Sequence, residues 1–180
     1  MTVVGAGALC ALGGLAYGLK RLPLDLIPTA GVISAALFVA SLVHVPVGPT
    51  SVHLVLNGLA GLVLGWAAFP VVFVALLLQA IFFGYGGITV LGVNTVSTAL
   101  PAVLVWWALH ATISNATPRL AGVVGGIGGA LAVLVSALVM AVSLVASGDE
   151  FLVAAQLTLL SHIPVMVVEG VLTGAAVYLI

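Results

Sequence analysis

Charge is what this sequence has least of. Its 180 residues include three basic and four acidic side chains, and 64% of the residues are apolar. A soluble domain carries about 25% charged residues, so these few charges cannot cover a water-exposed surface. The mean hydropathy of +1.46 agrees. We therefore expect lipid to surround most of the chain.

Other absences exclude whole classes of function. The net charge of −1 comes without a basic cluster, which argues against nucleic acid as a partner. The single cysteine, Cys10, cannot form an internal disulfide and is interpreted as a small packing residue. The sequence has no HExxH, GxSxG or Walker A motif. We therefore predict neither catalysis nor ATP hydrolysis by this chain, and no permanent cofactor.

The apolar runs are continuous, as in VVFVALLLQAIFF at 71–83, whereas a membrane-barrel strand alternates apolar and polar residues. A spanning helix needs about 20 apolar residues. The pattern predicts an all-α, polytopic membrane helix bundle of about seven transmembrane helices in a single domain, 1–180. Charges, prolines and glycines divide the chain into spans at about 3–19, 28–43, 50–68, 70–83, 95–113, 120–146 and 151–179.

Residues 84–94 (GYGGITVLGVN) are too apolar and too short for an ordinary water-exposed loop. A re-entrant path is one conformation open to this segment, and protein must then cover its backbone. With seven spans, Lys20, Arg21 and Arg119 all fall on one side. Basic residues stay on the cytoplasmic side, so we expect the amino terminus outside, the carboxyl terminus inside and the 84–94 loop outside.

Most polar residues of the predicted spans then lie in the outer half or at mid-depth: His44, His53, Gln79, His162 and Glu169. Ionisable groups inside a membrane usually face the bundle interior. Imidazole suits Co, Ni, Cu and Zn ions, and the scarcity of carboxylates argues against Ca and Mg. His53 is compatible either with a metal ligand or with a histidine hydrogen-bonded between helices.

The other candidates have simpler interpretations. His44 is typical of a histidine in an interfacial loop. His110 lies near the cytoplasmic end of its predicted span, and we expect it to have no functional role. Glu169 could bind metal, carry a proton or act with His162. These two lie seven residues apart on one helix face, about 10 Å along its axis, so they would not touch directly. A polar link from Glu169 to a neighbouring helix is the simplest interpretation.

Four stretches, in this order, resemble the CbiM/NikM family, the substrate-binding membrane components of cobalt and nickel energy-coupling-factor transporters. They are HVPVGPTSVHL at 44–54, Gln79-Ala80, GGITVLGVN at 86–94 and HIPVMVVEG at 162–170. The resemblance extends from about residue 12 to residue 177.

The resemblance implies seven transmembrane helices and one Co²⁺ or Ni²⁺ ion bound near the outer face of a prokaryotic cell membrane. It makes His53 a metal ligand and gives Gln79 and Asn94 supporting roles. It implies a transmembrane coupling subunit, two cytoplasmic ATPase subunits and a small accessory membrane subunit as partners.

The family's opening Met-His-Ile, which supplies its other ligands, has no match in Met1-Thr2-Val3. A misplaced start, a truncation and a divergent member are all compatible with that departure. It leaves His53 as the one ligand carried over, with His44 and His162 as candidates to replace the others. A self-contained ion- or proton-coupled carrier using Glu169 and His162 is the alternative. It is less favoured, because we find no internal repeat and no second buried acid.

Overall fold

The computed structural model describes residues 2–47 and 50–180, and this part of the chain is almost entirely helical. The strands β1 (His44–Val47) and β2 (Thr50–His53) pair as an antiparallel hairpin. The predicted all-α bundle is confirmed, with the hairpin as an addition. The described helices are α1 (Thr2–Lys20), α2 (Ile27–Ala40), α3 (Asn57–Leu64), α4 (Ala68–Phe83), α5 (Leu91–Ser114), α6 (Pro118–Val145) and α7 (Leu152–Leu179).

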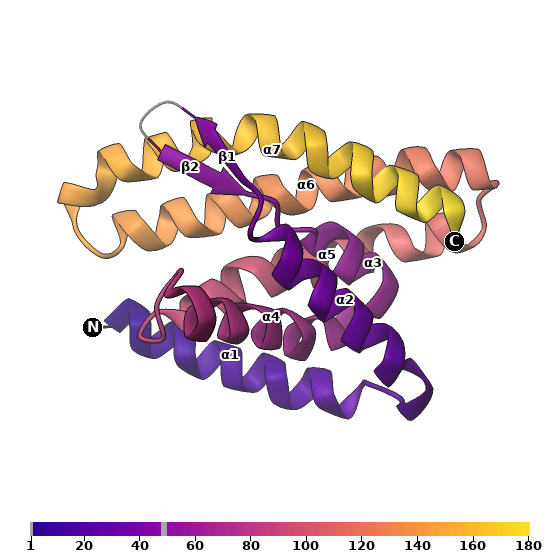
Figure 1. Cartoon of the computed structure of the whole chain (residues 1–180), viewed down its shortest axis with the longest axis horizontal. Helices are drawn as coiled ribbons and strands as arrows, with labels where there is room; N and C mark the ends of the chain where they lie inside the picture. The colour runs from indigo at the N-terminus through magenta and orange to yellow at the C-terminus, as the bar shows by residue number, and fades with distance from the viewer. Residues whose placement is uncertain (1, 48–49) are drawn as a thin grey trace.

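Helices α6 and α7 lie side by side along one side of the molecule, and α1 and α4 lie along the opposite side (Figure 1). Glycines form the contact between α6 and α7, which we call the α6–α7 seam. A Cβ atom at Gly126 would lie 2.9 Å from the carbonyl oxygen of Gly170, and one at Gly174 would lie 2.8 Å from that of Gly122. Small residues let membrane helices approach this closely, so the glycine cluster of α6 is a packing face.

Close contacts also set the directions of the helices. Gly7 of α1 lies against Val93 at the start of α5, so these two helices begin at the same end. Gly61 of α3 lies against the carbonyl group of Ala102, and Gly65 against the ring of Trp106. Helix α3 therefore runs parallel to α5.

Helix α4 runs the other way. Gly18, near the end of α1, lies against Trp66 and Pro70, so α4 starts where α1 ends. The chain reverses at Gly65, whose φ of 55° is a left-handed conformation that favours glycine. Successive helices thus alternate in direction, as seven crossings require.

By length and apolar composition, five helical stretches in the described residues could cross a membrane, and the segment 24–40 is shorter. One of the five, Asn57–Phe83, contains both α3 and α4 and turns back on itself. The span expected at 50–68 is wrong in its first half, because the chain there is not helical. Thr50–His53 is a strand, and helix begins only at Asn57. β-Branched Val and Thr alternate along both strands of this hairpin, and such residues favour extended backbone.

The loop expected at 84–94 is shorter than predicted, because α5 begins at Leu91 and the non-helical part is 84–90. The backbone N–H of Asn94 donates to the carbonyl oxygen of Val90 at 2.9 Å, so Asn94 lies in the first helical turn.

Pro101 lies inside α5 and Pro164 inside α7. Membrane bundles tolerate proline inside a helix.

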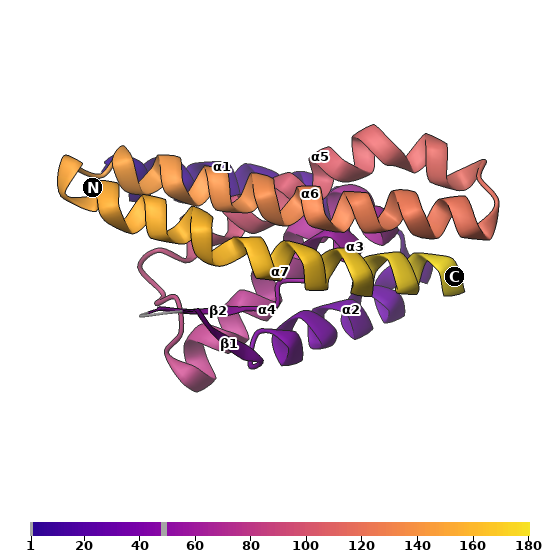
Figure 2. The same ribbon diagram turned by 90° about the horizontal axis from the view of Figure 1, so that it is seen from above.

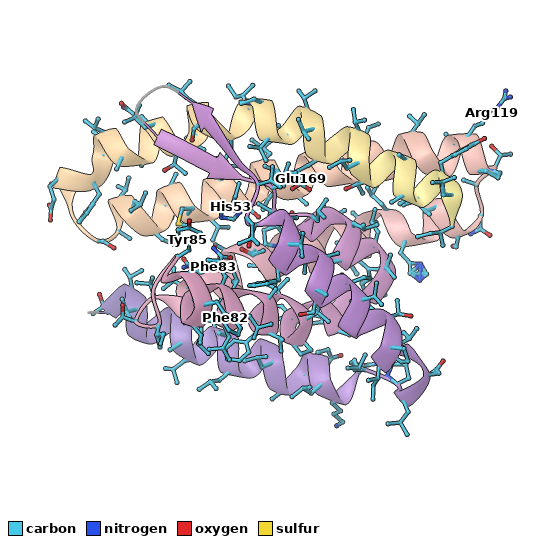
Figure 3. The ribbon with its side chains drawn as sticks, in the orientation of Figure 1. His53, Phe82, Phe83, Tyr85, Arg119 and Glu169 are labelled. Carbon is cyan, nitrogen blue, oxygen red and sulfur yellow. The ribbon has the colours of Figure 1, made fainter. Side chains whose placement is uncertain are left out.

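The two ends of the bundle differ in charge. The α1–α2 connection with Lys20 and Arg21 and the α5–α6 connection with Arg119 lie at one end, with the carboxyl terminus (Figures 1 and 3). The hairpin and the α4–α5 loop lie towards the opposite end (Figure 2). The charge asymmetry expected from the sequence is therefore an asymmetry of the folded molecule.

Candidate metal centre

A vestibule of about 220 Å³ lies where the α4–α5 loop meets the hairpin and α6. Gly86 and Gly87, with φ of 72° and 71°, give this loop two left-handed residues in succession. The Asn94 side chain donates from Nδ2 to the carbonyl oxygen of Gly86 at 3.4 Å, which ties the loop to α5. The vestibule is lined by His53, Leu76, Gln79, Tyr85, Gly86, Gly87, Leu91, Asn94, Ser97, Thr98 and Met140.

A second, smaller cavity of about 90 Å³ lies deeper in the bundle. It is lined from α2, α4, α5, α6 and α7, and by the chain just after β2. His162 lines only this inner cavity, and Asn94 lines only the vestibule. The residues that line both are His53, Leu76, Gln79, Ser97, Thr98 and Met140.

His53 therefore lies at the junction between the vestibule and the inner cavity. It is the last residue of β2 and is half-buried. It lies between the α6–α7 pair and Phe82 and Phe83 at the end of α4 (Figure 3). Its Nδ1 lies 3.0 Å from the carbonyl oxygen of Leu54. A carbonyl oxygen only accepts, so in this hydrogen bond Nδ1 carries the proton and the lone pair of the ring is on Nε2. A hydrogen bond of this kind also fixes the orientation of a ligand ring.

The chain that follows His53 is held by Glu169 of α7. The backbone N–H groups of Val55 and Leu56 both donate to Oε1 of Glu169, at 2.7 Å for Leu56. The Glu169 side chain is fully buried. Leu56 is the one non-glycine residue in the described chain with a positive φ, 50°. A left-handed conformation costs a leucine about 1–2 kcal/mol, so the Glu169 contacts hold a strained segment in place.

Glu169 and His162 do not pair with each other. The Nδ1 of His162 donates to the carbonyl oxygen of Thr158 at 2.7 Å, while Glu169 accepts from the β2–α3 connection. The Oε2 atom of Glu169, Oδ1 of Asn57 and Oγ1 of Thr173 are buried and have no hydrogen-bond partner in the described structure.

Gln79 of α4 is only 4% exposed and lines both cavities. Its amide has no hydrogen-bond partner among residues 2–47 and 50–180. This side chain therefore places an amide at the junction of the two cavities.

The two remaining histidines lie in different places. His44 is the register partner of His53 in the hairpin, and its side chain lies outside the described part of the structure. His110 is near the other end of α5, with its ring edge-on to Trp106 at 5.2 Å. It lines neither cavity.

No group of three or more His, Cys, Asp or Glu side chains occurs together in the described residues. A metal ion at this junction would therefore take amide, thioether, hydroxyl, backbone or water ligands beside imidazole. Sequence reasoning missed Met140, whose thioether suits soft and borderline metals, and also Ser97, Thr98 and Ser136. For Ser97 and Thr98, helical spacing contained a signal, because they follow Asn94 by three and four residues on the same helix face.

Known proteins resemble this chain over its whole length. The family CbiM, described as cobalt uptake substrate-specific transmembrane region, matches residues 1–180. A Haemophilus influenzae protein described as a "Putative metal transport protein" is 42% identical over 186 residues, which covers 97% of this chain and 86% of that protein. The fused nickel transport protein NikMN of Rhodobacter capsulatus is 39% identical over 99 residues, covering 52% of this chain and 28% of that protein.

The fold is also known. The crystal structure of a transition metal transporter matches with a TM-score of 0.76 at 24% identity, over 99% of this chain and 87% of that one. At this identity the match shows a shared fold.

Proposed function

The chain belongs to the CbiM family of cobalt-uptake, substrate-specific transmembrane regions, and from this premise we propose that it captures Co²⁺ or Ni²⁺ at His53. It is a multi-pass membrane protein and a component of cobalt and nickel uptake, and it is not an enzyme. The transported ion is its substrate.

The position of His53 carries the proposal. Its ring is oriented by the Nδ1–H donated to Leu54, and it lines both the vestibule and the inner cavity. Imidazole nitrogen is a preferred donor for Co and Ni ions. Gln79 lines the same junction, and Asn94 holds the loop that covers it. His44, opposite His53 in the hairpin, is the candidate for a further ligand at this level.

The distribution of charge supports an orientation. Helix α1 ends at Lys20, Arg21 follows it, and α6 begins beside Arg119; these ends lie opposite the α4–α5 loop that lines the vestibule (Figures 1 and 3). Since basic residues remain in the cytoplasm, the vestibule faces outward, the amino terminus lies outside and the carboxyl terminus lies inside.

Energy for uptake comes from other subunits in this proposal. The sequence has no nucleotide-binding motif. A transmembrane coupling subunit and two cytoplasmic ATPase subunits would drive release of the ion inward, with a small accessory membrane subunit in the assembly. A self-contained carrier with a Glu169–His162 relay is less well supported, because the two side chains bond to different backbone groups.

The test is His53→Ala, with His110→Ala as the matched control. Loss of a partner that merely orients a ligand costs about 10–100-fold in affinity, so loss of the ligand itself should weaken Ni²⁺ or Co²⁺ binding by more than about 100-fold. Titration calorimetry of the purified protein measures the affinity, and radiolabelled uptake by cells with the whole transporter measures function. Wild-type affinity in the His53 variant would refute the site.

Omitting the ATPase subunits in the same cells distinguishes the two mechanisms. Uptake should fall to background in their absence. Undiminished uptake would instead favour a self-contained carrier.

A further inference from the structure

A groove of about 660 Å³ runs along the α6–α7 seam. The residues that line it line neither the vestibule nor the inner cavity. We propose that this groove binds one phospholipid with an anionic headgroup, whose phosphate lies at Arg119 and whose acyl chain follows the seam. The inference does not depend on capture of a metal ion at His53.

Along most of its length the groove is apolar and open to its surroundings. Gly126 and Gly170 lie in its floor, where the backbones of the two helices meet. Val123 of α6 and Val171 of α7 also line it, and they are 62% and 67% exposed. Because glycine has no side chain, the floor lies lower than the valine side chains beside it. Lipid surrounds this chain, so the apolar part of the groove suits a hydrocarbon chain.

One end of the groove is polar. Arg119 lines it and lies at the end of the α6–α7 pair (Figure 3). A Cβ atom at Gly122 would lie 3.0 Å from Cβ of Tyr178, which places this tyrosine at the same end. In the described part of the chain neither Arg119 nor Tyr178 has a hydrogen-bond or ion-pair partner, whereas Arg21 donates to a tyrosine hydroxyl at 2.8 Å. A guanidinium matches the geometry of a phosphate, so this end suits a phosphate group.

The start of α6 adds a second positive feature at this end. The helix begins at Pro118, and Thr117 at its N-cap makes no side-chain hydrogen bond to the first turn. The first N–H groups of a helix have no intrahelical partner, and the helix dipole places a partial positive charge there. Phosphate binds favourably at such a helix end. Arg119 and the start of α6 therefore both favour an anion at the same place.

The length of the groove fits one leaflet of a bilayer. Along α6 the groove extends from Arg119 to Ala130. These residues are eleven positions apart, which is about 16–17 Å at 1.5 Å per residue. Half of a hydrocarbon core of about 30 Å is about 15 Å. A phospholipid with its headgroup at Arg119 would therefore have its acyl chain in the groove down to the middle of the bilayer.

A helix of another subunit also fits an apolar groove, and charge distinguishes the two occupants. In the orientation proposed above, the Arg119 end is cytoplasmic. Membrane helices carry Lys and Arg at their cytoplasmic ends, so a second helix would bring like charges to Arg119. The lipids of the cytoplasmic leaflet bring negative charge. The charge at the end of the groove therefore favours lipid.

Two variants test the two parts of the ligand separately. Arg119→Gln removes the charge, and its control, Lys20→Gln, removes a charge from the same end of the bundle outside the groove. Ala175→Phe fills the groove, and its control, Ala16→Phe, adds the same bulk on α1. All four positions are exposed, so we expect the variants to fold. Titration of the delipidated protein with phosphatidylglycerol or phosphatidylcholine, followed by native mass spectrometry, measures the affinity for the first lipid.

We expect the wild-type protein to bind phosphatidylglycerol more tightly than phosphatidylcholine. Arg119→Gln should weaken phosphatidylglycerol binding by about fivefold, equivalent to about 1 kcal/mol, and leave phosphatidylcholine binding within about twofold. Ala175→Phe should weaken binding of both lipids by about fivefold or more, because its ring occupies the place of the acyl chain. Both controls should bind as the wild type does.

Equal phosphatidylglycerol affinity in Arg119→Gln and Lys20→Gln would overturn the headgroup site. Equal affinity in Ala175→Phe and Ala16→Phe would overturn the groove. In the whole transporter, a photoreactive group on Ala175→Cys, in a Cys10→Ser background, should cross-link to lipid. A cross-link to another subunit would overturn the lipid in favour of a helix. Wild-type metal affinity in His53→Ala refutes capture at His53 and leaves the lipid measurements unaffected.

Discussion

Glu169 should hold the segment that follows His53 in its folded conformation. Its Oε1 accepts from the backbone N–H groups of Val55 and Leu56. In Glu169→Ala both donors lose their partner in a half-buried place. Each unsatisfied donor costs about 1–3 kcal/mol, so the segment 54–56 becomes easier to open by about 2–6 kcal/mol. The strained φ of Leu56, worth about 1–2 kcal/mol, adds to the tendency to open.

Hydrogen exchange measures this opening directly. A tenfold change in an equilibrium corresponds to about 1.4 kcal/mol, so the amides of Val55 and Leu56 should exchange at least about 30-fold faster in Glu169→Ala. Peptides covering 53–57, followed by mass spectrometry, report these amides. The α6–α7 seam, which Glu169 does not hydrogen-bond, supplies reference peptides.

Glu169→Gln is the matched control, because its amide oxygen can accept the same two hydrogen bonds. It should keep exchange near the wild-type rate. Metal affinity should fall about 10–100-fold in Glu169→Ala, as for other groups that orient a ligand, and by less in Glu169→Gln. Wild-type protection of Val55 and Leu56 in the alanine variant would refute the anchoring role.

Two further predictions concern the bundle and its orientation. Gly61→Ala should destabilise the protein by about 1–3 kcal/mol through overpacking, because its new Cβ would collide with the carbonyl oxygen of Ala102. Gly13→Ala, where the new atom meets nothing within 4 Å, should leave thermal unfolding in detergent unchanged or raise its midpoint, and equal loss in both would contradict the packing argument. A membrane-impermeant maleimide added to intact cells should label Ser147→Cys and not Asn115→Cys, and the reverse pattern would invert the proposed orientation.

The bundle was largely predictable from the sequence because its solvent is lipid. Continuous apolar runs and three basic residues were enough to place most of the crossings and to put the basic residues at one end. Glu169 also has the kind of partner that its cost in a membrane requires. The partner is a pair of backbone N–H groups, those of Val55 and Leu56. A pattern of side chains in the sequence cannot reveal a backbone partner.

The hairpin was not predictable from hydropathy. Val52 is as apolar in a strand as in a helix, so hydropathy predicted one continuous span over 50–68. Met140 was missed for a related reason. Its place in the two cavities that His53 lines depends on how α6 packs against α5 and α3. The sequence indicates which face of each helix is apolar, and it does not indicate which helix lies next to it.

The hairpin and Glu169 are linked by one physical requirement. In the third crossing, extended chain replaces helix in the outer half, so the backbone N–H groups there have no intrahelical acceptor. Non-helical backbone at membrane depth must be satisfied by protein, and Glu169 supplies one carboxylate oxygen to two of those groups. A half-length α3 also fills less space than a full helix would, and Asn57 in its first turn donates to Thr98 and Ser136, which both line the inner cavity. The buried acid therefore stabilises the break in the helix that leaves room for the cavity lined by His53.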